Sequence, residues 1–209
     1  NTKVGAADVD LDYTVERAEA QPLALTRVYE SGSVNRANNL DQVAIIDLRG
    51  PDDGAFHDAY RAYAVRARLE REHGHHDNQL IWRGTTPLFG DATYMSAAVI
   101  ALDDWLGEVE LDTRDLPLAQ KLLDNKPADL LERCTNGSGV DAPQETCDAQ
   151  VRVYASPRIY AGMPFTDDVV KCTLKPLSQD DYPGVTFTAA QWQQMVDTFG
   201  DTGVCDYTV

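Results

Sequence analysis

Two short apolar runs, separated by a charged helical segment, constrain the fold of this chain most. The first is Val43–Asp47, within a strand expected over Gln42–Leu48, and the second strand is expected over Gln79–Arg83. A continuous apolar run is typical of a parallel strand with both faces covered. Two such strands joined by a helix predict parallel neighbours connected by a right-handed crossover.

The segment between the two strands has the spacing of a helix. Phe56, Tyr60, Ala64 and Ala67 recur on one side, and Gly74 provides a stop signal. This helix carries His57 in its first turn. A further helix is expected from about Tyr94 to Leu106, with four apolar residues on one side: Met95, Val99, Leu102 and Leu106. The order strand, helix, strand, helix predicts an α/β fold.

The rest of the chain has weaker signals. A helix is expected from Pro22 to Tyr29, closed by Gly32, and another near the C-terminus, where Thr188 and Gln191 fit a capping box and Gly200 ends the segment. The buried face of this last helix is expected to comprise Trp192, Met195, Val196 and Phe199. Residues after Glu110 predict two short helices, Pro117–Asn125 and Pro127–Arg133, and two strands, Gln150–Tyr154 and Val169–Leu174.

The four cysteines lie in the last third of the chain, without metal-site spacing. Disulfides are the preferred interpretation, ahead of free thiols and zinc. Of the three connectivities, Cys134–Cys147 with Cys172–Cys205 closes one short loop, a gain of about 3 kcal/mol in the chain-entropy model, and fixes the C-terminus. Disulfides predict an oxidising location, either extracellular (secreted) or periplasmic.

The chain is strongly acidic, with 34 Asp and Glu against 18 Lys and Arg and a net charge of −16. This charge argues against nucleic acid and against an anionic membrane surface as partners. No apolar run is long enough for a transmembrane helix. The first residue, Asn1, is not Met, which leads us to expect a processed fragment whose active site is shared with another chain.

An acid and a base are expected together at the first strand-to-helix connection. His57 is expected at the positive end of a helix dipole. This position favours a neutral imidazole, the form that a general base requires. Asp47, Asp52 and Asp53 are close enough in sequence for one of them to orient it. This is the acid and base pair of an acyl-transfer triad. In the alternative interpretation, His57 is a surface residue and Asp53 is a helix cap.

A nucleophile to complete the triad is missing from the sequence. The chain contains no Gly-x-Ser-x-Gly turn, and Ser33 and Ser138 lie in loops without a preceding buried strand. We therefore expect the serine on a partner, the N-terminal chain of the same precursor.

Two other clusters suggest metal ligands. His73, His75, His76 and Asp77 follow one another at an expected helix end, where a solvated terminus is favoured over zinc. The residues Asp8, Asp10, Asp12 and Glu19 have the spacing of a calcium loop, but Tyr13 stands where the loop needs Gly. No cofactor is therefore expected, and calcium is kept as an alternative.

A set of short motifs spans roughly residues 25–209. They are Ile45–Arg49, His57, Ala64–Leu69, Asp77–Gln79, Asp104–Leu106, Lys126–Pro127, Pro157–Arg158, Ala161–Pro164, Lys171–Pro176, Asp181–Tyr182 and Gly203–Tyr207. Together they resemble the C-terminal part of a family of large secreted bacterial proteins of unknown function with α/β-hydrolase character.

The resemblance implies the last part of an α/β-hydrolase-like sheet. Three regions follow: a polar segment, residues 1–40, joining a partner chain or upstream domain; a hydrolase-like portion, 41–110; and a disulfide-stapled, loop-rich extension, 111–209, packed on the same domain. The usual hydrolase order places the catalytic His after the last strand, yet no His follows Arg83. The function expected is a heteromeric, secreted serine-type hydrolase of carboxylic esters or amides, with small-molecule or polymeric substrates. The alternative is a non-catalytic structural or substrate-binding subunit.

Overall fold

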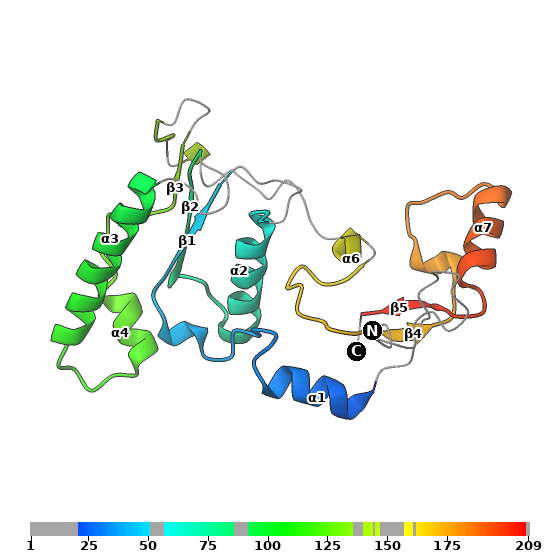
Figure 1. The fold of residues 1–209 in the computed structure, drawn as a ribbon, viewed down its shortest axis with the longest axis horizontal. Coiled ribbons are helices and arrows are strands. Elements are labelled where there is room, and N and C mark those ends of the chain that lie inside the picture. The colour runs from blue at the N-terminus through cyan, green and yellow to red at the C-terminus, as the bar shows by residue number, and fades with distance from the viewer. Residues whose placement is uncertain are drawn as a thin grey trace. The chain divides into compact units, whose positions relative to one another are not determined.

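The described part of the chain forms two compact units. A computed structural model describes residues 21–50, 57–85, 92–135, 140–143, 145–146, 157–160 and 162–207. The larger unit contains the described residues of 36–160 together with Phe165–Asp167, and the smaller unit contains those of 1–35, 161–164 and 168–209. Figure 1 shows the elements of each unit.

A three-stranded parallel sheet lies at the centre of the larger unit. Its strands are β1 (Ile45–Arg49), β2 (Gln79–Arg83) and β3 (Arg133–Cys134), in the order β1-β2-β3. Ile45 pairs with Gln79 and Arg49 with Arg83, so the predicted parallel neighbours are confirmed. The first strand begins later than predicted, because Leu40–Gln42 form a short 3₁₀ helix, η1. The segment Pro127–Arg133 is not a helix; it leads into β3.

Helices cover both faces of this sheet (Figure 1). Helix α2 (Tyr60–His73) lies on one face, and α3 (Ala92–Leu111) and α4 (Leu118–Asp124) lie on the other. A single turn, α6 (Pro157–Tyr160), also belongs to this unit. The layers are helix, sheet and helix, as expected for an α/β fold.

Helix α2 begins later than the sequence predicted. Its first residue is Tyr60, so His57 lies before the helix and not in its first turn. The carboxylate of Asp58 accepts a hydrogen bond from the backbone N–H of Tyr60 at 2.8 Å, and this local turn competes with helical hydrogen bonding. Gly74 ends the helix in a left-handed conformation, as predicted.

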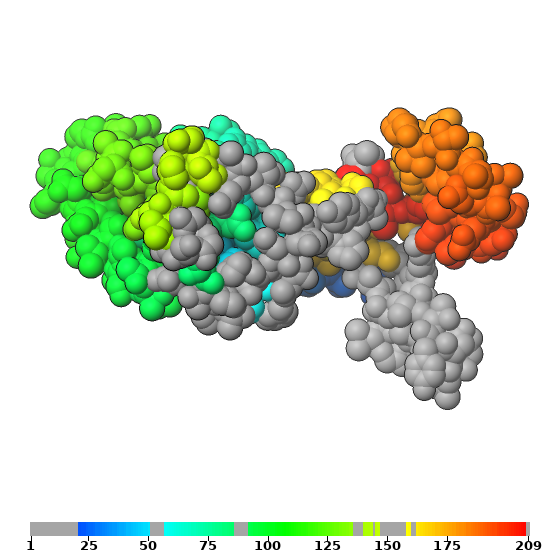
Figure 2. Space-filling model, turned by 90° about the horizontal axis from the view of Figure 1, so that it is seen from above, coloured from blue at the N-terminus to red at the C-terminus, as the bar shows by residue number. Residues whose placement is uncertain are grey.

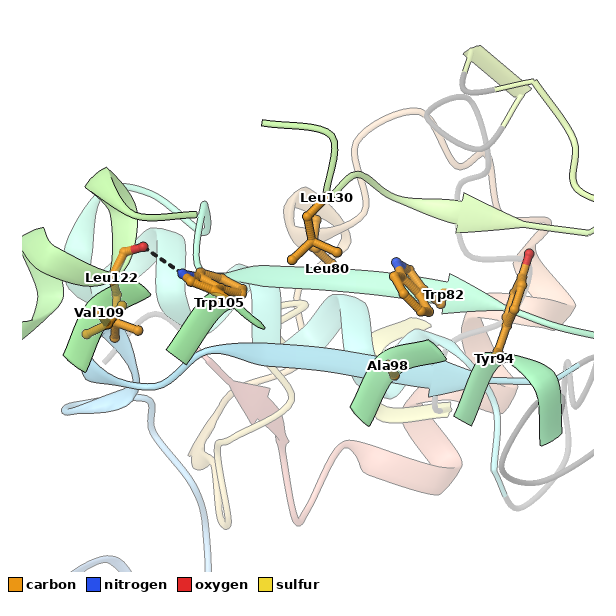
Figure 3. Close-up of a cluster of buried hydrophobic side chains, with 8 residues drawn as sticks. All are labelled: Leu80, Trp82, Tyr94, Ala98, Trp105, Val109, Leu122 and Leu130. Atoms are coloured by element: carbon orange, nitrogen blue, oxygen red, sulfur yellow. Dashed lines mark hydrogen bonds between the residues drawn. The ribbon is translucent and has the colours of Figure 1, made fainter. Parts of the chain in front are cut away.

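The apolar core lies between the sheet and the helices α3 and α4. Trp105 is fully buried and donates from its indole nitrogen to the carbonyl oxygen of Leu122 at 2.9 Å (Figure 3). Trp82 and Tyr94 meet edge to face, with ring centroids 5.7 Å apart. The cluster comprises Leu80, Trp82, Tyr94, Ala98, Trp105, Val109, Leu122 and Leu130.

The predicted side of α3 is not its buried side. The buried residues are Tyr94, Ala98, Trp105 and Val109, while Met95, Val99 and Leu106 are exposed. Apolar residues occupy more than one face of this helix, so periodicity alone does not select the face that contacts the sheet.

The smaller unit has fewer buried residues. It contains α1 (Pro22–Glu30), the 3₁₀ helix η2 (Gln179–Asp181), α7 (Ala189–Phe199), and an antiparallel pair, β4 (Thr173–Lys175) with β5 (Val204–Asp206). The predicted capping box of α7 is confirmed, but no residue of α7 is buried. Its aromatic face is half-exposed: Trp192 contacts Phe187, which contacts Tyr182. The strand predicted over Gln150–Tyr154 lies outside the described residues.

Disulfides form as expected. Cys172 is bonded to Cys205, which joins β5 to the start of β4. Cys134 is also disulfide-bonded, and its predicted partner Cys147 lies outside the described residues. Among the described helices, none has both the length and the apolar character needed to cross a membrane.

Candidate functional site

Asp47 lies within β1, on the face that α2 covers, and not in the strand-to-helix connection where an acid was expected beside His57. One carboxylate oxygen accepts a hydrogen bond from Arg49 at 2.9 Å, and the other accepts one from the amide nitrogen of Gln79 at 2.8 Å. The Asp47 and Arg49 side chains are about one-fifth exposed. Both oxygens of Asp47 therefore have partners on the sheet itself.

This pair belongs to a polar network between the sheet and α2. Gln79 also donates to the carbonyl oxygen of Ala62 on α2, and Arg66 of the same helix donates to Gln79. Arg66 forms an ion pair with Glu132, whose carboxylate accepts a hydrogen bond from the backbone of Ile81. Each of these side chains thus has at least one partner in a partly buried layer, although the Nε of Arg49 is buried without one among the described residues. The network gives Asp47 a structural role whatever its chemical one.

His57 lies in the connection from the carboxyl end of β1 to α2. It is half-buried, and the neighbouring Asp58 is only 2% exposed. The other two candidate acids, Asp52 and Asp53, lie outside the described residues. In open parallel sheets, ligands bind beyond the carboxyl ends of the strands. The position of His57 agrees with that rule.

A second polar cluster, which the sequence did not predict, involves the first turn of α3 and β3. Tyr94 donates from its hydroxyl to Asp141 at 2.5 Å, and Arg133 donates to the same carboxylate at 2.6 Å. The Arg133 guanidinium lies 4.5 Å from the ring centroid of Tyr94 and 4.8 Å from that of Trp82. Trp82 and Tyr94 are far in sequence from Arg133 and Asp141, so no spacing signal connects the two pairs.

The cluster changes the acidity of two of its members. Burial, reinforced by the hydrogen bond to Asp141, raises the pKa of Tyr94 well above its ordinary value near 10. The hydrogen bond from Tyr94, followed by that from Arg133, lowers the pKa of Asp141. Tyr94 therefore remains a neutral hydrogen-bond donor, and Asp141 an ionised acceptor.

Two hollows border Arg133. The larger has a volume of about 420 Å³ and lies between α3 and the segment that precedes β3. Trp82, Ala97 and Leu130 contribute apolar lining, and Asp104, Asp129 and Arg133 contribute charge. The smaller, of about 270 Å³, is lined by Glu132, Cys134 and Asp141 among others. The larger hollow falls within the size range of small-molecule sites.

Two of the three histidines that suggested a metal site have other partners, and the Nδ1 of the third, His75, is buried without a hydrogen-bond partner in the described part of the chain. His73 contacts the carbonyl oxygen of Ala37 at 2.7 Å, and His76 pairs with Glu70. Over the ranges that the structure describes, no group of three or more His, Cys, Asp or Glu residues is arranged to hold a metal ion. The expected calcium ligands, Asp8 to Glu19, lie outside those ranges.

The two weak serine candidates gain no support as nucleophiles. Ser33 lies in the turn after α1, with its hydroxyl 2.8 Å from that of Ser31. Ser138 lies outside the described residues.

Several residues that carried the family resemblance are structural. Asn78 is fully buried and donates to the carbonyl oxygens of Leu40 and Val43 at 2.7 and 2.8 Å. Lys126 donates to the carbonyl oxygen of Asp77 at 2.9 Å, and burial lowers the pKa of this lysine. These contacts stabilise the sheet at the amino-terminal ends of its strands. His57 lies at the opposite end, after the carboxyl end of β1.

Comparison with known proteins supplies the last observation. No curated protein and no solved structure matched the chain. One family model matched, over residues 1–209. The chain belongs to the tannase-like family of unknown function (DUF6351).

Proposed function

We propose that this chain is part of a secreted carboxylic ester hydrolase, with amides as the second class of bond, and that its active site is completed by a partner chain. The observation that carries the proposal is membership of a tannase-like family over the whole chain, which suggests hydrolase character. The disulfide between Cys172 and Cys205 supports an oxidising, extracellular location.

His57 is the general base in this proposal. Its place after the carboxyl end of β1 is where an open parallel sheet holds its chemistry. Imidazole titrates near neutral pH and is the side chain most often used for this task. The orienting acid is Asp52, Asp53 or Asp47. Of these, Asp47 already uses both carboxylate oxygens within the polar network.

The nucleophile is a serine of the partner chain, which comes from the same precursor. The absence of a Gly-x-Ser-x-Gly turn from all 209 residues supports this part of the proposal. Backbone amides of the partner would stabilise the oxyanion. The serine Oγ attacks the ester carbonyl carbon while His57 takes its proton. His57 then returns the proton to the leaving alcohol, and water hydrolyses the acyl-enzyme by the same two steps.

Turnover of 4-nitrophenyl esters and anilides by the protein expressed from its complete coding sequence tests this assignment. His57→Ala is expected to lower kcat by roughly 10²–10⁴-fold, the usual contribution of general base catalysis. His76→Ala is the matched control, because His76 pairs with Glu70 on the solvent side of α2. Unchanged turnover in a folded His57→Ala variant would overturn the assignment.

A substrate-binding subunit without catalytic residues is the second candidate. The hollow of about 420 Å³ beside Arg133 favours it, because apolar lining with a few charged groups is typical of binding sites. Under this alternative, Asp129→Ala and Ala97→Trp weaken substrate binding, while His57→Ala changes neither binding nor turnover. Isothermal titration with a slowly hydrolysed ester separates the two candidates.

A further inference from the structure

The larger hollow, of about 420 Å³, has an apolar floor. Trp82 and Leu130, drawn in Figure 3, line it and belong to the buried core. Ala97 and Ala101 of α3 also line it, and they pack against the same core. Because an alanine side chain ends at its β-carbon, these two positions leave space between α3 and the segment that precedes β3.

The rim of the larger hollow is apolar as well, but it is exposed. Ile100 of α3 and Leu131 of the segment before β3 both line the hollow, and they are 63% and 49% exposed. Figure 2 shows the green atoms of α3 and the yellow-green atoms around β3 at the surface of the larger unit. An exposed apolar rim above a buried apolar floor suits the hydrocarbon part of a small ligand.

Two carboxylates without partners also line the larger hollow. Asp104 lies on α3 and Asp129 lies before β3, and both residues are exposed. Among the described residues, neither side chain forms a hydrogen bond or an ion pair. By contrast, Asp112, Glu132 and Asp141 each pair with an arginine. The hollow therefore offers two acceptors that no group of the described chain uses.

Arg133 is the one cation that lines the larger hollow, and its charge is already balanced. Its guanidinium donates to Asp141 at 2.6 Å and lies 4.8 Å from the ring centroid of Trp82. Asp141 lines the smaller hollow and not the larger one. Even when Arg133 is counted in full, two carboxylates leave the larger hollow net negative, and the chain's charge of −16 acts in the same direction.

We propose that the larger hollow binds a small organic ammonium ion, that is, a primary amine with an apolar body. The ammonium group lies at Asp104 and Asp129, and the hydrocarbon part covers Trp82 and Ile100. An ammonium group only donates hydrogen bonds and a carboxylate only accepts them, while removal of hydrocarbon from water is favourable. The inference goes beyond the proposed function, because a simple amine contains no ester or amide bond to hydrolyse.

A metal ion and an anion fit the larger hollow less well. Calcium takes about six or more oxygen ligands, whereas the lining here is mostly hydrocarbon. Over the described ranges, no group of three or more His, Cys, Asp or Glu residues is arranged to hold a metal. An anion would have to displace Asp141 from Arg133 and would be repelled by Asp104 and Asp129.

Three probes with the same hydrocarbon chain test the charge preference. Hexylammonium, 1-hexanol and hexanoate are titrated into the full 209-residue chain and followed by NMR. The reporters are the methyl groups of Ala97 and Ala101 and the indole N–H of Trp82, which donates to the carbonyl oxygen of Leu131 at 2.9 Å. Hexylammonium should bind roughly tenfold or more tightly than hexanoate, and added salt should weaken only the ammonium. Equal affinities, or tighter binding of hexanoate, would overturn the proposal.

Paired substitutions test the two carboxylates. Asp104→Asn with Asp129→Asn should lower the affinity for hexylammonium roughly tenfold and leave that for hexanol unchanged, because only the ammonium loses a charge partner. Asp103→Asn with Asp115→Asn is the matched control, since it removes the same charge at exposed positions outside the hollow. Circular dichroism checks that both variants fold. Equal losses in the two pairs would mean general attraction to an acidic chain and would contradict a site in the hollow.

Ile100→Ser tests the apolar rim. It should lower the affinities for hexylammonium and hexanol alike, by roughly threefold or more, because both lose the same hydrocarbon contact. Val99→Ser is the matched control: Val99 is 64% exposed and does not line the hollow. Equal losses for the two variants would reject the hollow as the binding site.

His57→Ala separates the amine site from the proposed hydrolase. This variant should bind hexylammonium as the unaltered chain does, while ester turnover falls. Loss of hexylammonium binding in a folded His57→Ala variant would contradict the amine site. Unchanged turnover together with unchanged binding would reject the hydrolase and leave the amine site supported.

Discussion

The two units of this protein are stabilised by different means. In the larger unit, one tryptophan, Trp105, is fully buried among the residues of α3, α4 and the sheet. In the smaller unit, α1 and α7 have no buried residue, and the disulfide between Cys172 and Cys205 joins its two strands. Hydrogen bonds between distant segments add to this: Tyr29 donates to the carbonyl oxygen of Asp168 and accepts from the amide of Val170.

The difference shows which interactions a unit needs when its apolar core is small. Burial of apolar area supplies most of the stability of an ordinary domain, and small domains compensate with covalent links. We therefore expect core substitutions to affect the larger unit most, and cross-link or cap substitutions to affect the smaller.

The largest effect is expected from Trp105→Ala. Loss of a buried tryptophan and the cavity that remains should lower the free energy of unfolding by about 3–5 kcal/mol. Urea denaturation followed by circular dichroism measures this loss. Leu111→Ala, at a position 74% exposed on the same helix, should change stability by less than about 0.5 kcal/mol. Similar losses for the two variants would mean that α3 does not pack through Trp105.

The next effect is expected from Cys172→Ser with Cys205→Ser. The cysteines are 33 residues apart, and losing such a link costs about 3–4 kcal/mol in the chain-entropy model. Hydrogen exchange should increase at β4, β5 and α7 and remain unchanged in β2. An equal increase in both units would show that their stabilities are not separate.

Asp47→Ala tests the polar face of the sheet. It leaves Arg49 and Gln79 without one hydrogen-bond partner each, at a cost of about 1–3 kcal/mol. Asp103→Ala, at an exposed position of α3, is the control for loss of charge. Equilibrium unfolding in urea measures both. If Asp47→Asn keeps the stability and loses ester turnover, then Asp47 also orients His57.

The smallest effect is expected from Thr188→Ala, at the start of α7. The Thr188 hydroxyl accepts a hydrogen bond from the backbone of Gln191 at 3.3 Å, and Gln191 bonds back to the Thr188 amide at 2.9 Å. Removal of such a cap costs about 1 kcal/mol. Exchange rates in the first turn of α7 report the change. Thr188→Ser retains the hydroxyl and should restore slow exchange, and a failure to do so would indicate that packing, not capping, fixes this end.

Elements with strong local signals were predictable. The β2 bounds match the prediction, Gly74 closes α2, and Thr188 with Gln191 caps α7, because each signal depends on residues close together in sequence. The strand β3 was missed, since two residues leave no periodic pattern. For the candidate site, His57 was predicted in the first turn of the helix that follows the first strand. The helix in fact begins at Tyr60, so His57 lies in the connection before it.

The sequence by itself determined the strand, helix, strand, helix order from β1 to α3, the parallel pairing of β1 with β2 and the Cys172–Cys205 link. Apolar periodicity, turn residues and cysteine spacing are local, so they can be read along the chain. Only the tertiary structure decided which face of α3 is buried, that Asp47 bonds to Arg49 and Gln79, and that Tyr94, Arg133 and Asp141 meet. The buried face of α3 and the two polar clusters depend on side chains from distant segments. A polar group in them acquires its partner only when the helices and the sheet pack together.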